Sequence, residues 1–176
     1  MFKFWFKREL NDKTNSDCWD DIPSDSIYTT FKKFHINFDK QMEYFYKIGP
    51  IDEKSFEEQM YLDAILGTLI NSSTTRDLQI TNSYIEQAYI LFVEYIKKHL
   101  VSHEQPFEKL DVKAMFFDYT KRMFEENKEH FEEKIGEGTP DYIINSVRSF
   151  LNIYRYRKYK INKIKKFILE ENKNEH

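Results

Sequence analysis

Cations and aromatic residues alternate near the C-terminus, in a pattern typical of a binding surface. The cations would pair with phosphates or carboxylates, and the tyrosines would stack on bases. This basic strip consists of Arg155, Tyr156, Arg157, Lys158, Tyr159, Lys160, Lys163 and Lys166. The alternative interpretation is that these cations complement the dipole near a helix C-terminus and lie on a solvated face.

The charge of the chain is unevenly distributed. Residues 148–166 contain eight basic side chains and no acidic one, although the whole chain has a net charge of -3. The rest of the chain is therefore acidic, and it would repel a long polyanion. For this reason we expect the strip to bind an acidic protein, with nucleic acid as the alternative.

A second, weaker candidate surface is acidic. Its residues are Glu125, Glu126, Glu129 and Glu133. Long-range attraction would speed the encounter of such a surface with a basic partner. A solvated helix face is the alternative interpretation.

Two histidines have the spacing of a helical metal site. His99 and His103 are four residues apart, which places both imidazoles on one helix face. The sequence has no HExxH motif, no repeated Glu-x-x-His motif and no glycine-rich phosphate loop. We interpret the pair as part of a polar helix terminus beside Lys97 and Lys98, and we expect no catalytic residue, metal or cofactor.

Length and composition bound the class of protein. A chain of 176 residues fits one domain, and 30 aromatic residues with only four glycines favour helices around an aromatic core. The single Cys18 excludes an internal disulfide. The longest apolar run, residues 88–93, is too short to span a membrane, and residues 1–10 lack the features of a secretory signal. These features predict a cytoplasmic protein.

One segment is apolar around most of a helix and is expected to form the centre of the fold. It starts at Ser83, where Ser83 and Glu86 match a capping box, and runs to His103. Ile90 and Val93 occupy the face that would otherwise be solvated. A helix of this kind needs neighbours on nearly all sides.

Amphipathic patterns predict four further helices. They span residues 24–48, 55–70, 111–135 and 139–171, and the second has a capping box at Ser55 and Glu58. The expected fold is an all-α, single-domain bundle of about five helices around residues 83–103. Residues 1–23 would form an N-terminal arm and loop, residues 24–171 the bundle, and residues 172–176 a flexible tail.

The last two predicted helices would form an antiparallel hairpin about Gly138. In that hairpin, facing residue numbers add up to about 276, because both helices rise about 1.5 Å per residue. The acidic residues 125–133 would then face residues 143–151, and the basic strip would face residues 110–121. That segment has as many lysines as aspartates, so it would leave the charge of the strip uncompensated.

These observations favour a non-catalytic helical protein that binds another protein. An inhibitor or immunity-type partner of a toxin or defence-system protein is the form we expect, because the Lys, Asn and Ile bias is typical of AT-rich bacterial or phage genomes. A nucleic-acid-binding protein that uses residues 154–166 is the alternative, and a metal-dependent helical enzyme is the second alternative. The sequence leaves self-association open.

Overall fold

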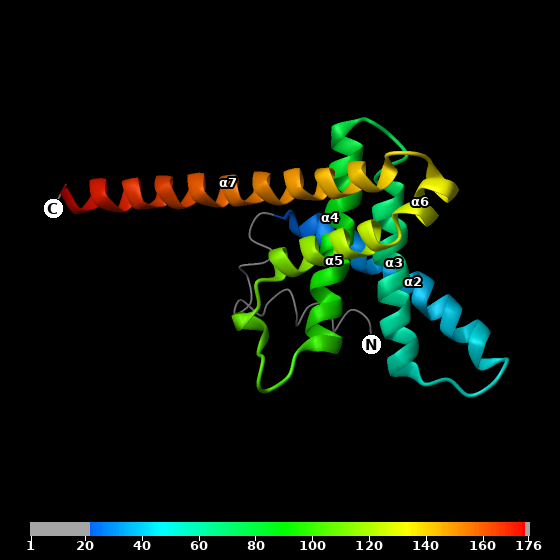
Figure 1. The fold of residues 1–176 in the computed structure, drawn as a ribbon. Helices are drawn as coiled ribbons and strands as arrows, with labels where there is room; N and C mark the ends of the chain where they lie inside the picture. The colour runs from blue at the N-terminus through cyan, green and yellow to red at the C-terminus, as the bar shows by residue number, and fades with distance from the viewer. Residues whose placement is uncertain (1–21, 175–176) are drawn as a thin grey trace.

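The chain folds into α-helices joined by short loops (Figure 1). The computed structural model describes residues 22–174, without the side chains of residues 153–167, 171, 172 and 174. Within that part the α-helices are α2 (Ser24–Tyr46), α3 (Glu53–Asn71), α4 (Leu78–Tyr95), α5 (Val112–Glu126), α6 (Lys128–Ile135) and α7 (Thr139–Asn174). A π-helical turn (Ile96–Leu100) and a 3-10 turn (Phe107–Lys109) complete the described elements. The predicted all-α bundle is confirmed.

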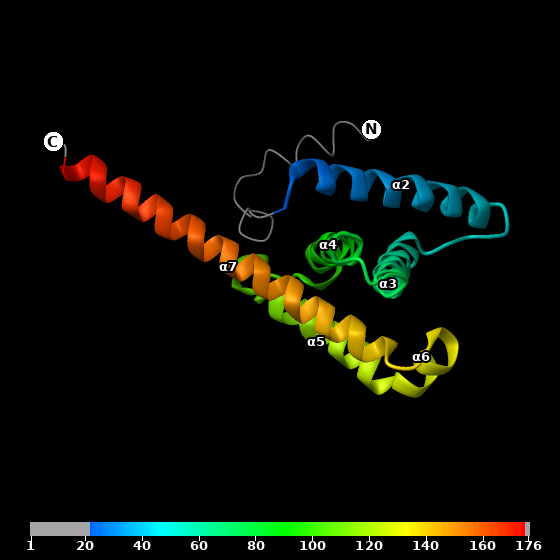
Figure 2. The same cartoon turned by 90° about the horizontal axis from the view of Figure 1, so that it is seen from above.

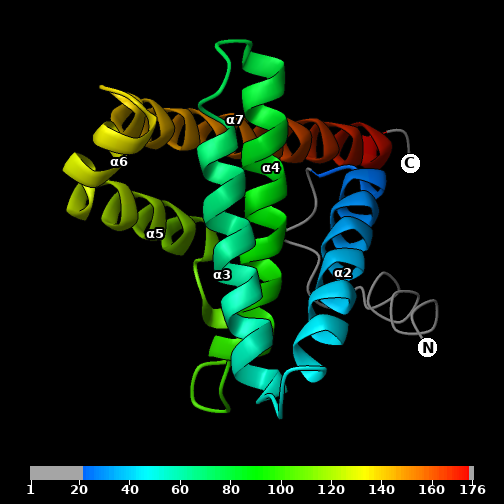
Figure 3. The ribbon, with the colours of Figure 1, turned by 90° about the vertical axis from the view of Figure 1, so that its right-hand side faces the viewer.

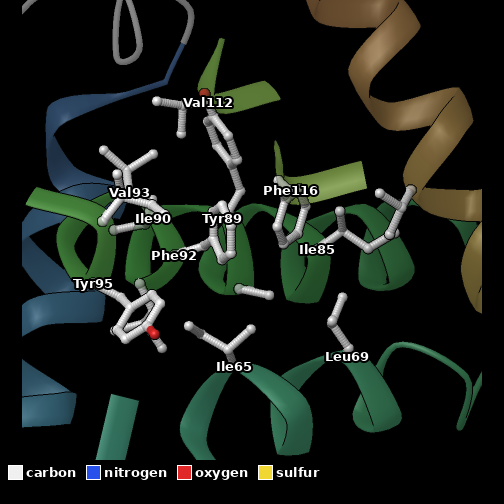
Figure 4. Packing of buried hydrophobic residues seen from close by; sticks show 14 of the residues in the cluster. Ile65, Leu69, Ile85, Tyr89, Ile90, Phe92, Val93, Tyr95, Val112 and Phe116 are labelled. Carbon is white, nitrogen blue, oxygen red and sulfur yellow. The ribbon is translucent and has the colours of Figure 1, made fainter. Parts of the chain in front are cut away.

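Helix α4 is buried along its C-terminal half. Every residue from 88 to 96 is buried, and Ile90 and Val93 are 0% exposed. Ile65 and Leu69 of α3 lie on one side of α4, and Phe116 of α5 lies on the other (Figure 4). Helices α2 and α7 also contact α4 (Figure 2). A fully buried aliphatic side chain stabilises the fold by roughly 1.5–3 kcal/mol, so this segment contributes much of the core energy.

The cap of α4 is not the predicted one. The carboxylate of Asp77 accepts hydrogen bonds from two amides of the first turn, at 2.9 and 3.2 Å, so α4 begins at Leu78. Ser83 therefore lies inside the helix, and the capping box predicted at Ser83 and Glu86 is wrong. An aspartate at this position satisfies the same unpaired amides that a serine cap would satisfy.

Helix α3 shows a similar difference. Its cap is Asp52, whose carboxylate accepts hydrogen bonds from the Ser55 amide at 3.5 Å and from the Ser55 hydroxyl at 2.8 Å. The helix begins at Glu53 rather than at Ser55. Glu58 does not complete a capping box, because its carboxylate accepts a hydrogen bond from the Tyr95 hydroxyl at 3.4 Å.

The loop between α3 and α4 is joined to the start of α7. The Thr81 hydroxyl donates to the Ser72 carbonyl at 3.2 Å and lies 3.1 Å from the Tyr142 hydroxyl. Tyr142 donates to the Thr75 carbonyl at 3.2 Å, and the Arg76 guanidinium lies 3.9 Å from the centre of the Tyr142 ring. These contacts fix the position of the first turn of α7 on the bundle.

Helix α2 packs on the bundle mainly through its first half. Ile27, Phe31 and Phe34 are buried, as their spacing predicts, whereas Phe45 is exposed. The helix ends at Tyr46, close to the predicted end at residue 48. Figure 3 shows α2 separated from the closely packed pair α3 and α4 along part of its length.

The predicted fourth helix is divided in two at Asn127. Helix α5 ends at Glu126, and α6 begins at Lys128. Helices α5 and α7 lie side by side and run in opposite directions (Figure 2), and the Arg148 guanidinium lies 5.3 Å from the centre of the Phe117 ring. These two residue numbers add up to 265 instead of 276, so the predicted hairpin register is wrong. The break at Asn127 takes α6 out of the hairpin and shortens it.

Helix α7 continues past the end of the bundle (Figure 1). Ile143, Val147, Phe150 and Leu151 are buried, as predicted, but Ile168 is 50% exposed. The helix continues to Asn174, so it includes the first three residues of the segment predicted as a tail. The predicted N-terminal arm lies outside the described residues except for its last two, of which Ile22 is buried.

The two candidate caps of α4 can be separated by substitution. Asp77→Ala should lower the free energy of unfolding by about 1 kcal/mol, because two amides of the first turn lose their acceptor. Ser83→Ala should leave it unchanged or raise it by a few tenths of a kcal/mol, because alanine is the better helix former. Urea unfolding followed by circular dichroism measures both values. If Ser83→Ala lowered the free energy of unfolding more than Asp77→Ala does, Ser83 rather than Asp77 would be the N-cap of the helix.

Candidate functional site

The basic strip has a helical backbone and lies where α7 leaves the bundle. Arg148 is level with Phe117, and both helices rise about 1.5 Å per residue, so Val112 at the start of α5 is level with residue 153. Residues 155–166 therefore lie on turns of α7 that have no counterpart in α5. Their side chains lie outside the described part of the structure.

Apolar positions with helical spacing recur along α7, with one interruption at Arg157 and Lys158. Buried residues recur at positions 143, 147 and 150. Tyr154, Ile161, Ile164 and Ile168 continue the series at spacings of four, seven, three and four. Positions with this spacing lie on one helix face. By its sequence, the helix face that α7 buries in the bundle is apolar again from Ile161 to Ile168, after an interruption at Arg157.

The acidic residues do not lie on one continuous helix. Glu125 and Glu126 end α5, Glu129 and Glu133 lie on α6, and all four are exposed. Lys128 lies between the two pairs in the chain. Its Nζ atom is 3.1 Å from the Asp141 carboxylate, and this hydrogen-bonded ion pair raises the pKa of Lys128. The four acidic residues are therefore divided between two helices, with a paired cation between them in the chain.

The two histidines are not on one helix. The π-helical turn ends at Leu100, and His103 is exposed in the loop that follows. His99 points elsewhere: its Nε2 lies 3.2 Å from Glu57 Oε1, and its side chain is 4% exposed. Among residues 22–174, no group of three or more His, Cys, Asp or Glu side chains could hold a metal ion.

His99 belongs to a charge cluster that the sequence analysis missed. Lys98 Nζ lies 3.7 Å from the Glu94 carboxylate and 4.0 Å from the Glu57 carboxylate. The Lys98 ammonium also donates to the Tyr61 hydroxyl at 3.4 Å. The side chain of Glu94 is only 2% exposed. This buried charge cluster joins α3 to the π-helical turn that ends α4.

His35 of α2 lies close to the same cluster. Burial, together with the positive charge of Lys98, lowers the pKa of His35 from 6.5 to about 4, although Glu57 opposes the shift. The neighbouring Phe34 ring stacks on the Tyr61 ring with centroids 4.2 Å apart. His35 is therefore neutral at pH 7, and its packing against the bundle depends on that neutrality.

The charge cluster fits a structural role better than a catalytic one. Two hollows are described on the surface, and neither is lined by Glu57, Lys98 or His99. A signal for the cluster was present in the sequence, because Glu94 interrupts a segment that is otherwise apolar on all faces. Its partners could not be found from the sequence, since Glu57 is about forty positions away in the chain.

The two hollows differ in position. One, of about 530 Å³, lies at the end of the π-helical turn and is lined by Lys97, Val101, Ser102, His103, Pro106, Phe107 and Glu108. The other, of about 500 Å³, lies between α2, α3 and α4. We call it the α2–α3 groove. Its lining residues are Thr30, Lys33, Phe34, Ile36, Asn37, Lys40, Ala64, Gly67, Thr68, Asn71, Gln87 and Leu91.

None of the helices within residues 22–174 has the length and apolar character needed to cross a membrane. Comparison of the chain with protein-family models, with curated proteins and with solved structures gave no match.

The role of Lys98 can be tested by removing its charge. Lys98→Met should lower the free energy of unfolding by about 2–3 kcal/mol, because it removes the cation nearest to the buried Glu94 carboxylate. Adding Glu94→Gln to that variant should recover part of the loss. Lys97→Met is the matched control and should cost less than about 1 kcal/mol. Equal losses for the two single lysine variants would contradict the assignment.

The lowered pKa of His35 predicts how stability depends on pH. The folded protein resists protonation of His35, so its contribution is complete above pH 6.5 and decreases as the pH falls from 6.5 toward 4. We expect His35→Phe to remove about 2–3 kcal/mol of that decrease. Urea unfolding at pH 4, 5, 6 and 7 measures it. Parallel profiles for wild type and variant would show that His35 titrates normally.

Proposed function

We propose that this chain is a non-catalytic helical protein that binds another protein through the C-terminal half of α7. The observation that supports the proposal is the extension of α7 beyond the start of α5, where the sequence has apolar residues with helical spacing at Ile161, Ile164 and Ile168. The partner would cover the apolar face, and its acidic groups would pair with the basic strip.

The first argument concerns the stability of an uncovered helix. An isolated helix of about twenty residues is only marginally stable in water, because most helix stability in proteins comes from packing of an apolar face. Ile168 and Leu169, on the last turns of α7, are 50% and 61% exposed. A partner that buries this face would therefore also stabilise the helix.

The second argument concerns charge. Lys160, Lys163 and Lys166 occupy helix positions away from the face of Ile161, Ile164 and Ile168, which suits a helix that binds in a groove with an acidic rim. Arg157, four residues before Ile161, lies on the apolar face. A duplex surface would use the cations but would have no need of Ile161, Ile164 and Ile168. This difference favours a protein partner.

A narrower form of the proposal is an inhibitor or immunity-type protein that binds a toxin or defence-system protein. Such partners act by covering a functional surface, and a helix that extends from a bundle can enter a groove on that surface. The extension of α7 beyond the start of α5 supports this narrower proposal. Experiment must identify the partner.

Nucleic acid is the second candidate, and the position of the strip favours it more than the sequence did. Helix α6 lies at the start of α7, so about 21 Å of helix, from Asp141 to Arg155, separates its acidic residues from the strip. The Debye length at physiological salt is about 8 Å. Repulsion of a polyanion by that acidic surface would therefore be screened.

Charge reversal on α7 tests the proposal. The variant Lys163→Glu/Lys166→Glu should lose a partner that wild-type chain captures from extracts of its source cells. The control Lys121→Glu/Lys134→Glu changes the net charge equally on α5 and α6 and should retain that partner. Calorimetry with the purified partner should then show at least tenfold weaker binding for the α7 variant only. Equal binding by the two variants would contradict the proposal.

Fluorescence polarisation separates the two candidates. Labelled random-sequence DNA and RNA are titrated with the wild-type chain at 50 and 200 mM salt. We expect weak binding to both. Tight binding that weakens a hundredfold or more over that range, and that Lys163→Glu/Lys166→Glu abolishes, would favour nucleic acid instead.

A further inference from the structure

The α2–α3 groove has a cationic wall. Lys33, Asn37 and Lys40 line it at i, i+4 and i+7 positions of α2, which places them along one helix face about 10 Å long. None of the described residues that line the groove is acidic. Among the side chains that the structure describes, no carboxylate forms a salt bridge with Lys33 or Lys40. The wall can therefore accept an anion.

The floor of the groove is apolar and held in place by the core. Phe34, Ala64 and Leu91 form it, and Phe34 is fixed by its stacking on the buried Tyr61 ring. Ile36, 48% exposed, lies at the rim. A pocket of about 500 Å³ with an apolar floor and a few polar groups has the size and composition of a small-molecule site.

Gly67 leaves space in the groove that the chain itself does not use. It lies inside α3, where glycine is less favourable than alanine because it loses more backbone freedom on folding. It has no positive φ angle, and a Cβ atom built on it would meet nothing within 4 Å. Neither conformation nor packing within the described residues requires a glycine here.

We propose that the α2–α3 groove binds a small amphipathic anion, such as a carboxylate attached to an apolar chain. Lys33 and Lys40 would pair with the carboxylate, and Asn37, Asn71 or Gln87 would donate hydrogen bonds to it. The apolar chain would lie over Phe34 and Leu91 and would use the space at Gly67. The groove is lined by residues of α2, α3 and α4 and not by α7. A test of the small-molecule site is therefore independent of the proposed protein binding by α7.

Decanoate is the probe that tests the site, and decanol is its uncharged analogue. In a heteronuclear NMR titration of the full chain, decanoate should cause saturable shifts confined to residues 30–40, 64–71 and 87–91. Lys33→Glu/Lys40→Glu should weaken binding at least tenfold, whereas the control Lys54→Glu/Lys121→Glu should change it less than twofold. Decanol should bind at least tenfold more weakly than decanoate.

Filling the groove gives a second, independent measurement. Gly67→Leu should abolish the decanoate shifts without lowering the midpoint of thermal unfolding, because the new side chain enters open space and leucine is the better helix former. Shifts that do not saturate, that lie outside the groove, or that are equal in both lysine variants would overturn the proposal. So would a partner protein that occupies the groove in place of decanoate.

Discussion

Burial of α4 is the constraint on which the rest of the structure depends. A helix that is apolar around most of its circumference must be covered by other elements, and α2, α3, α5 and α7 each supply a part of that cover. Their positions are thereby set. The same constraint explains why the only charged residue among positions 88–96, Glu94, carries a network of its own: Lys98 and, through it, Glu57 and Tyr61.

How much of this could be predicted from the sequence depends on the range of the interactions. The helices and most of the core residues follow from periodicity, which is a local property. The helix starts could not be predicted from the capping-box pattern alone. Serine followed by glutamate three residues later also occurs inside helices, as at Ser83. Asp77 and Asp52 were the true caps, and residues 78–82 became helical because Thr81 packs against the loop after α3 and against α7.

The candidate surfaces, too, were predictable where they depend on local sequence and unpredictable where they depend on long-range packing. The position of the basic strip on a long helix could be predicted, but its register against α5 could not, because the break at Asn127 removes α6 from the hairpin. That single break places the strip beyond the start of α5 and splits the acidic residues between two helices. The groove and the charge cluster join residues from three or four helices, so no local pattern indicates them.

Helix α7 thus has two parts: the first completes the cover of α4, and the second continues past the start of α5. Native-state hydrogen exchange of the isolated chain tests this division most directly. Amides of residues 88–96 should exchange only through global unfolding, and amides of residues 155–174 should exchange with little protection until a partner is added. Equal protection of the two segments in the isolated chain would contradict it.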